Sequence, residues 1–463
     1  MIQANFHRSA FCVCFLLIVT ACKGSMSSQS ESTDAGSSAQ REDRPAATGG
    51  GGAGAKNDKT AGSSGSGQAK PAGHSENPAA AGSGGAVVQS GGGTSGSAGK
   101  DTETRAGQGG EQSIAGQGGA GSSAAGSGKQ FVYVSGYGPN IHVLELDTQA
   151  GQLAELTTVS GGMSPSYMAF SPDKRFAYAI NEADGADSKV LAFAVDAKTG
   201  KLGALNSQVT GGSGSPHLAV HPSGKWVAVA HYSSGEVSVL PIAADGKLGS
   251  ASKPDRGPNN DAENAHQAVF DQSGDHLLVP CLGSNYVLQY KFEAGELKYN
   301  DPPTVAVEGG PRHLAFDPSE THAYVLSELE SKITWFDYDK ATGKLSNPKI
   351  INSFDKQAGS SAHIVVHPNG KWLYASNRKE NSLGLFSIAA DATPSPVAFE
   401  KDMISGPRDF SLDPTGEWLI LANQNGAQTV LLYQIDQTSG KLTRKQTLPN
   451  NDQPTFTHAL ILP

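Results

Sequence analysis

The sequence predicts a seven-bladed β-propeller over residues 130–463, and three observations lead to this fold class. A tight-turn motif recurs with its last residue at 174, 224, 274, 320, 370 and 416, a period of about 46–50 residues that is typical of propeller blades. A second turn, such as TGKL, follows later in each unit. The segments between turns, such as NYVLQYKF and KITWFDYD, alternate in the manner of strands.

Each unit therefore offers about four short strands joined by two hairpin turns, with no amphipathic helix of useful length between them. The first turn begins with Asp, His or Ser and continues, in five of the six units, with Pro and then mostly small polar residues, which suits a tight reversal. It reads SPDK at 171, HPSG at 221, DQSG at 271, DPSE at 317, HPNG at 367 and DPTG at 413. The second turn reads AGQL at 150, TGKL at 199, DGKL at 245, AGEL at 294, TGKL at 342 and SGKL at 439.

The two ends of this region supply the seventh blade. FVYVSG and IHVLEL, from residue 131 on, have no partner strand before them, and TFTHALIL at 455–462 has no partner strand after it. Pairing the terminal strands closes the ring and removes exposed sheet edges. An open β-solenoid with the same repeat is the structural alternative, but its uncapped ends would leave edges unpaired.

The first 21 residues predict a lipoprotein signal peptide. Arg8 precedes the apolar run AFCVCFLLIV, which is too short to span a membrane as a mature helix. The run ends in VTAC, which resembles a bacterial lipobox, so Cys22 is the expected lipid anchor; an ordinary signal peptide is the alternative. We therefore expect an exported lipoprotein, attached to a membrane through Cys22, in the periplasm or at the cell surface.

Residues 22–129 are expected to be a disordered tether. Between Lys23 and Gln130 there is no Phe, Trp, Tyr or Leu, so the segment cannot bury enough apolar surface to fold. The net charge of −9, without a basic run interleaved with aromatic residues, argues against a nucleic-acid partner. Cys281 is the one cysteine of the folded part, where we expect a small buried strand residue and no disulfide. We expect a monomer.

Charged residues gather at the open ends of the hairpins. Arg312 lies eight residues before Glu320, the last residue of its turn, and Glu328 lies eight after it, so the two should meet across the strand pair. The same offsets define a first column of Ser166, Pro216, His266, Arg312, Ala362 and Arg408, and a second column of Glu182, Tyr232, Leu282, Glu328, Arg378 and Gln424.

Because the first strand of every blade lines the channel of a propeller, both columns should converge on one mouth of that channel. A plain surface ion pair of little energetic value is the alternative interpretation of Arg312 and Glu328. A third column of Tyr167, His217, Gln267, His313, His363 and Asp409 should point the other way, since strand side chains alternate. Its histidines, and His221 and His367 in the turns, are expected to be structural.

Several motifs resemble the seven-bladed lactonase family, which includes propeller-type 6-phosphogluconolactonases and a fungal carboxymuconate cyclase. They are GGPRH…AY…SEL, SSAHIVVHPNGKWLYASNR, PRDFSLDPTGEWLILANQ and NEADG…TGKL, and the similarity covers nearly all of residues 131–463. The resemblance implies a functional histidine at His266, an arginine–glutamate pair at Arg312 and Glu328, and a second arginine at Arg378. The segment VPCLGSN has Cys281 and Asn285 where many members carry acidic residues, which leaves the substrate open.

These residue types suit hydrolysis of a lactone, a cyclic ester. Arginines can hold an anionic group or a developing oxyanion, and a histidine or carboxylate can take a proton from water. We expect His266 or Glu328 as the base, Arg312 and Arg378 at the anion, and Arg408, Glu182 and Gln424 as substrate-binding residues. The sequence has no zinc-type spacing of His and Cys, so neither a metal nor another cofactor is expected.

Two other functions remain open at this point. The propeller could be a non-enzymatic, surface-anchored scaffold that binds a glycan or a protein. It could also be a cycloisomerase that opens or closes a lactone without water at the same site.

Overall fold

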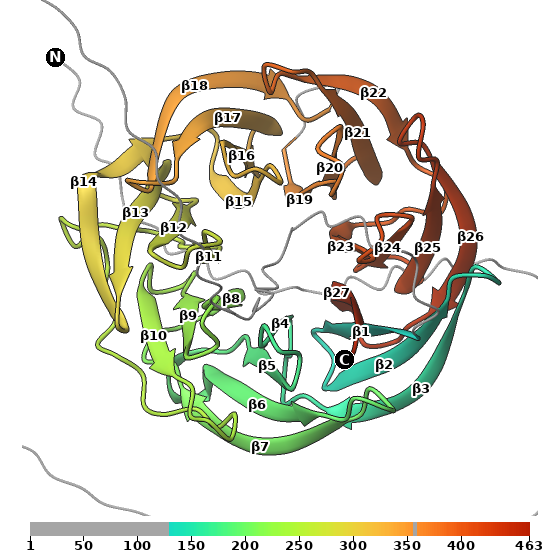
Figure 1. Ribbon diagram of the computed structural model, residues 1–463, viewed down its shortest axis with the longest axis horizontal. Coiled ribbons are helices and arrows are strands. Elements are labelled where there is room, and N and C mark those ends of the chain that lie inside the picture. The colour runs from blue at the N-terminus through green and yellow to red at the C-terminus, as the bar shows by residue number, and fades with distance from the viewer. Residues whose placement is uncertain (1–128, 355–358) are drawn as a thin grey trace, which may run out of the picture. The chain divides into compact units, whose positions relative to one another are not determined.

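The computed structural model describes residues 129–354 and 359–463. These form seven antiparallel sheets arranged around a central channel, which confirms the predicted propeller (Figure 1). We number the blades in chain order from the sheet that contains the first strand. In every blade the strand named first below faces the channel and the strand named last lies at the rim (Figure 1).

The first four blades contain strands β1 to β14 and the last strand of the chain. Blade one consists of β27 (Pro454–Ile461), β1 (Gln130–Gly136), β2 (Asn140–Asp147) and β3 (Gln152–Ser160). Blade two consists of β4 (Tyr167–Phe170), β5 (Phe176–Asn181), β6 (Lys189–Val195) and β7 (Leu202–Val209), with a short 3-10 turn, Gly185–Asp187, between β5 and β6. Blade three consists of β8 (His217–Val220), β9 (Trp226–Ala230) and β10 (Val237–Pro241). Blade four consists of β11 (Val269–Phe270), β12 (His276–Cys281), β13 (Tyr286–Glu293) and β14 (Glu296–Ala306).

The last three blades are regular. Blade five consists of β15 (Pro311–Phe316), β16 (His322–Ser327), β17 (Lys332–Asp339) and β18 (Lys344–Asn352). Blade six consists of β19 (Ser361–Val366), β20 (Trp372–Asn377), β21 (Ser382–Ile388) and β22 (Pro394–Glu400). Blade seven consists of β23 (Pro407–Leu412), β24 (Trp418–Asn423), β25 (Thr429–Ile435) and β26 (Leu442–Pro449).

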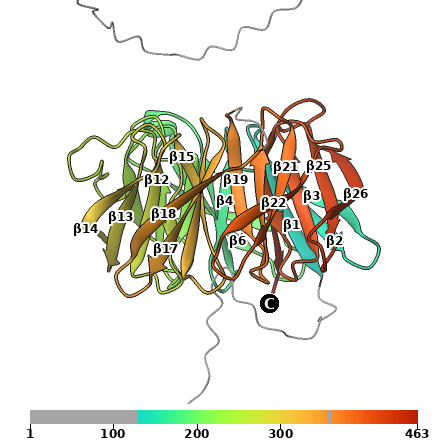
Figure 2. The same ribbon diagram turned by 90° about the horizontal axis from the view of Figure 1, so that it is seen from above.

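The ring closes as the sequence predicts. β27 pairs antiparallel with β1 from Gln130↔Ile461 to Gly136↔Pro454, so the C-terminal strand becomes the inner strand of blade one. Phe456 and Leu460 of β27 are buried in an apolar cluster shared with blade two. The C-terminus follows β27 and lies at one flat face of the ring, the lower one in Figure 2.

Blade three departs from the expected four strands. After β10 the chain makes only isolated bridges, Val237↔Asp255 and Ile242↔Leu248, in place of a fourth strand. Pro254 and Pro258 lie in this segment, and proline cannot donate a ladder hydrogen bond. The inner strand of blade four is also short, although His266 N–H still donates to Pro280 O at 2.9 Å across the pair. The expectation of four strands in every unit is therefore wrong for blade three.

Buried tyrosines tie neighbouring blades to the second turn. Tyr133 donates to Gly200 O at 2.7 Å, and Tyr374 donates in the same way to Gly440 O at 2.6 Å. Gly200 has φ +68°, and a Cβ there would lie 2.4 Å from the Phe131 ring. The repeated TGKL-type turn therefore has two roles: it reverses the chain and presents a carbonyl to the preceding blade.

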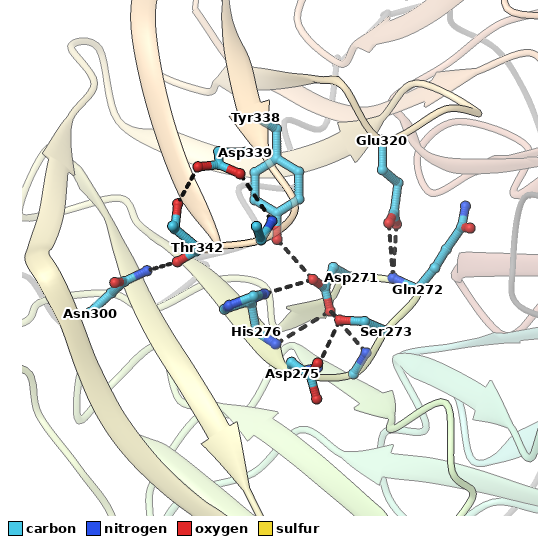
Figure 3. Close-up of polar contacts among 12 residues, drawn as sticks. Asp271, Gln272, Ser273, Asp275, His276, Asn300, Glu320, Tyr338, Asp339 and Thr342 are labelled. Carbon is cyan, nitrogen blue, oxygen red and sulfur yellow. Dashed lines mark hydrogen bonds and ion pairs between the residues drawn. The ribbon is translucent and has the colours of Figure 1, made fainter. Parts of the chain in front are cut away.

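Blades four and five, which supply His266 and Arg312, are joined at the ends of their inner strands far from those residues. Asp271 Oδ2 accepts a hydrogen bond from Tyr338 at 3.0 Å and lies 2.8 Å from His276 Nδ1 (Figure 3). Glu320, in the next turn, accepts from Gln272 N–H at 2.9 Å (Figure 3). These buried contacts fix the two blades against each other, because an unpaired polar group there would be costly.

The predicted signal peptide, the proposed anchor Cys22 and the tether lie outside the described residues. Among the residues that are described, no helix is long and apolar enough to cross a membrane. Cys281 is fully buried at the end of β12 as a free thiol, as the sequence predicts.

Candidate active site at the channel mouth

One backbone hydrogen bond repeats in every blade and fixes the two columns at the mouth. The N–H of each second-column residue donates to the carbonyl two residues before its first-column neighbour. The pairs are Glu182→Ser164, Tyr232→Gly214, Leu282→Asn264, Glu328→Gly310, Arg378→Ser360 and Gln424→Gly406, at 2.8–3.1 Å. The counting from the turns therefore placed the columns correctly.

Blade one adds a seventh pair that the counting missed. Tyr137 N–H donates to Gln453 O at 3.2 Å, which puts Tyr137 in the second column and Thr455 in the first. The count failed here because β27 and β1 are not joined by a turn. Tyr137 follows the last residue of β1 just as Glu328 follows the last residue of β16, so counting from strand ends would have found it.

β-Bulges turn the first-column side chains. The register of the inner strand pair shifts between Pro311 and His313 in blade five and between Pro407 and Asp409 in blade seven. Arg312 and Arg408 are the extra residues of these bulges. A bulge re-aims the side chains around it, so strict alternation no longer holds there.

A small cavity of about 10 Å³ lies at this mouth, with room for about one water molecule. It is lined by Ser166, Tyr167, Glu182, Pro216, His266, Arg312, His313, Arg408, Asp409 and Thr455. The structure thus brings four predicted site residues to one cavity. The prediction that the third column points away is wrong for Tyr167, His313 and Asp409, which line the cavity; for His313 and Asp409 the reason is the neighbouring bulge.

Glu328 is held between two arginines. Its Oε2 lies 2.9 Å from Arg312 Nε and its Oε1 lies 2.7 Å from Arg378 Nη2, so blades five and six are bridged by one carboxylate. Arg312 also donates to the Ala362 carbonyl of blade six. Arg312 is only 2% exposed, so its pair with Glu328 is not the plain surface ion pair that was the alternative interpretation.

The two arginines decide the protonation state of Glu328. Burial opposes its negative charge, but the charges of Arg312 and Arg378 outweigh burial and hold the pKa of Glu328 below its ordinary value. Glu328 is therefore a carboxylate at neutral pH. A carboxylate that is paired on both oxygens and has a lowered pKa is a poor proton acceptor.

Arg408 is held differently from Arg312 and Arg378. Its guanidinium carbon lies 5.2 Å from the centre of the Tyr137 ring, and no ion pair or hydrogen bond joins its side chain to any other described residue. Tyr137 donates to Glu182 Oε1 at 3.4 Å, beside the same cavity. Burial opposes the charge on Arg408, but Tyr137, Glu182 and Glu328 outweigh it and raise the pKa of Arg408. Arg408 is thus a cation whose hydrogen-bond donors are not used by other described residues.

His266 is a neutral imidazole at the cavity wall. It is 5% exposed, and its Nδ1 is buried without a hydrogen-bond partner in the described part of the chain. Burial, followed by the charges of Arg312 and Arg408, holds the pKa of His266 well below its usual 6.5. Its ring centre lies 5.2 Å from that of His313.

The third-column histidines form a connected group inside the channel. His313 Nδ1 lies 2.6 Å from His363 Nδ1, so one ring donates and the other accepts. The His217 ring lies 5.7 Å from the His313 ring and packs against Tyr167. Burial lowers the pKa of His217 and His313 well below the ordinary value, so both are neutral.

Three predicted site residues do not line the cavity: Glu328, Arg378 and Gln424. Glu328 and Arg378 are connected to it through the ion pair with Arg312. Gln424 follows β24 at the position equivalent to Glu328, and its backbone makes the repeated hydrogen bond. Tyr137, Thr455, His313 and Asp409 are the mouth residues that sequence reasoning missed as site residues.

Known proteins resemble this chain over the whole propeller. The family model described as "Lactonase, 7-bladed beta-propeller" matches residues 131–458. The 6-phosphogluconolactonase of Bacillus subtilis is 30% identical over 325 residues, covering 67% of this chain and 91% of that protein. The 6-phosphogluconolactonase of Pectobacterium atrosepticum is 34% identical over 324 residues, covering 68% and 93%. A solved Bacteroides fragilis protein, provisionally named a 6-phosphogluconolactonase, aligns with a TM-score of 0.67 at 26% identity, covering 73% and 99%.

Proposed function

The chain belongs to the seven-bladed β-propeller lactonase family, and from this premise we propose that it hydrolyses a sugar lactone at the channel mouth. Relatives that align over nine-tenths of their own length are named 6-phosphogluconolactonases, which supports a sugar lactone as the substrate. The observation that carries the location is the cavity on which the neutral imidazole of His266 and the guanidinium groups of Arg312 and Arg408 converge.

His266 is the general base in this proposal, in preference to Glu328. Glu328 is ionised and paired on both oxygens, whereas His266 is neutral with a free ring nitrogen. His266 accepts a proton as a water molecule attacks the lactone carbonyl carbon. The low pKa of His266 is no obstacle, because the negative charge that develops on the carbonyl oxygen favours the imidazolium beside it.

Arg312 stabilises the oxyanion, and Arg408 binds an anionic group of the substrate. Arg312 is fixed by Glu328 and the Ala362 carbonyl, so it needs no reorganisation as charge develops. Arg378 completes the clamp on Glu328. Arg408 has free donors, and its planar group suits a phosphate or a carboxylate. Glu182, beside Tyr137, faces the hydroxyl groups of the sugar.

The experiment that tests this function is product analysis in ¹⁸O-labelled water on sugar lactones with and without a 6-phosphate. We expect a hydroxy acid that carries one ¹⁸O in its carboxylate. An isomerised product without the label would indicate cycloisomerase chemistry. Binding without turnover on the whole panel would contradict hydrolysis and favour a binding scaffold.

We also propose that the protein is exported and anchored through Cys22, on the sequence VTAC after an apolar run. Cys22→Ser should release the protein from membranes, because a lipid chain supplies the membrane affinity of such a protein, and should leave the propeller folded. The measurement is membrane fractionation with a high-salt wash, and thermal melting of the released protein is the control. Retention of the variant on washed membranes would contradict the lipid anchor.

A further inference from the structure

Asp409 is a buried carboxyl group at the cavity that the mechanism above does not use. It follows Arg408 in β23, is 3% exposed, and lines the same cavity as His266 and Arg312. Its Oδ1 accepts a hydrogen bond from Thr457 N–H at 3.2 Å. Its Oδ2 lies 3.7 Å from His363 Nδ1, which is too far for a hydrogen bond.

The surroundings of Asp409 favour its neutral form. The charged and titratable groups that face it come from four inner strands: Tyr167 of β4, Arg312 of β15, His363 of β19 and Arg408 of β23. Neither arginine forms an ion pair with the carboxyl group, in contrast to the clamp on Glu328. Burial therefore outweighs these cations and raises the pKa of Asp409 to about 8. Besides His313, whose Nδ1 is paired with His363, the cavity thus contains a neutral base with an unpaired ring nitrogen among the described residues, His266, and a protonated acid, Asp409.

We propose that Asp409 is the general acid of lactone hydrolysis and delivers a proton to the ring oxygen through the one water molecule for which the cavity has room, while the attacking water enters with the substrate from the channel mouth. This inference rests on the proposed function. Ring oxygens of sugar lactones leave as alkyl alkoxides, which are poor leaving groups, so protonation as the bond breaks lowers the barrier. General acids act within hydrogen-bond reach or through one water molecule.

The step balances in atoms and charge. Water gives a proton to His266, and its oxygen forms a bond to the carbonyl carbon, which gives a tetrahedral oxyanion beside Arg312. The oxyanion collapses, the bond from carbon to the ring oxygen breaks, and that oxygen takes a proton from the relay water, which takes one from Asp409. The products are a hydroxy acid, imidazolium at His266 and carboxylate at Asp409. Transfer of one proton from His266 to Asp409 through solvent restores the starting state.

The test compares lactones that differ in their leaving group. An aliphatic sugar lactone leaves an alkoxide, whereas dihydrocoumarin leaves a phenolate that needs no acid. Asp409→Asn keeps the size and neutrality of the side chain but cannot give up a proton. We expect it to lower kcat by at least ~100-fold on the sugar lactone and by less than ~10-fold on dihydrocoumarin. Equal losses on the two lactones would contradict the general-acid role.

Asp413→Asn is the matched control, because Asp413 is also a buried carboxyl group and follows the other end of β23, far from the mouth. It should leave the ratio of the two rates unchanged.

The pH dependence of kcat in the wild-type protein tests the same role without a variant. After subtraction of spontaneous hydrolysis, kcat on the sugar lactone should fall as pH rises through about 8, the pKa of Asp409, and kcat on dihydrocoumarin should not. The same alkaline decline on both lactones would overturn the proposal.

A measurement of stability reports the protonation of Asp409 independently of activity. A carboxyl group whose pKa is higher in the folded than in the unfolded state stabilises the protein below its unfolded pKa and loses that contribution as pH rises through its folded pKa. The melting temperature of Asp409→Asn should therefore rise relative to wild type between about pH 4 and pH 8. A constant difference across this range would contradict a protonated Asp409.

The failure of this inference can be told apart from the failure of the proposed function. If the wild-type protein hydrolyses neither lactone, the proposed function fails. If it is active and Asp409→Asn loses activity equally on both lactones, only the general-acid role fails.

Discussion

Deleting residues 455–463 should abolish cooperative folding of the propeller. The deletion removes nearly all of β27, the inner strand of blade one, and with it the buried side chains of Phe456, Ala459 and Leu460. Burial of an aromatic or large aliphatic side chain contributes about 1.5–3 kcal/mol, so the loss of Phe456 and Leu460 alone is comparable with the lower end of the stability of a typical domain, about 5 kcal/mol. The deletion also exposes the inner edge of β1, which pairs with β27 along its length. Circular dichroism and thermal melting are the measurements.

The matched control is deletion of residues 23–125, from the segment expected to be a tether. This variant should melt at the wild-type temperature, because nothing in the composition of the segment predicts a packed core. An unchanged melting temperature for the C-terminal deletion would contradict closure of the ring by β27.

Replacing Arg312 by alanine should lower kcat/KM on a sugar lactone by at least ~100-fold, the usual scale for loss of an oxyanion donor. It should also destabilise the protein by about 1–3 kcal/mol, because it leaves the Ala362 carbonyl without its donor and Glu328 with one arginine. A purely structural ion pair would give the second effect without the first. Steady-state kinetics together with chemical denaturation separate the two outcomes, and wild-type kcat/KM in a destabilised variant would refute the catalytic role.

Sequence reasoning located the mouth because propeller repeats carry their register in the turns. Counting eight residues on either side of Glu320 placed Arg312 beside Glu328, and the same offset holds in the other five blades that contain a complete turn. The count could not reach Tyr137 and Thr455, since their strands come from opposite ends of the chain. That information lies in long-range pairing rather than in any local motif.

The burial and direction of the side chains were harder to predict than their position. The sequences of β15 and β23 show no sign of the bulges at Arg312 and Arg408. Simple alternation therefore predicted that His313 and Asp409 point away from the cavity, whereas both line it. The choice between His266 and Glu328 depends on Arg378, which lies in the next blade. A protonation state set by a neighbouring blade follows from the closed ring and not from the motif around the residue itself.

The site at the mouth is tested most directly by comparing kcat/KM of His266→Gln and His217→Gln on a sugar lactone. The two histidines are equally buried, at 5% and 4% exposure, and come from the inner segments of adjacent blades, so the substitutions cost similar packing. His266 lines the mouth cavity and His217 does not. We expect a loss of at least ~100-fold for His266→Gln and a value near wild type for His217→Gln. Near-wild-type activity in both variants, or equal losses in both, would contradict an active site at the mouth.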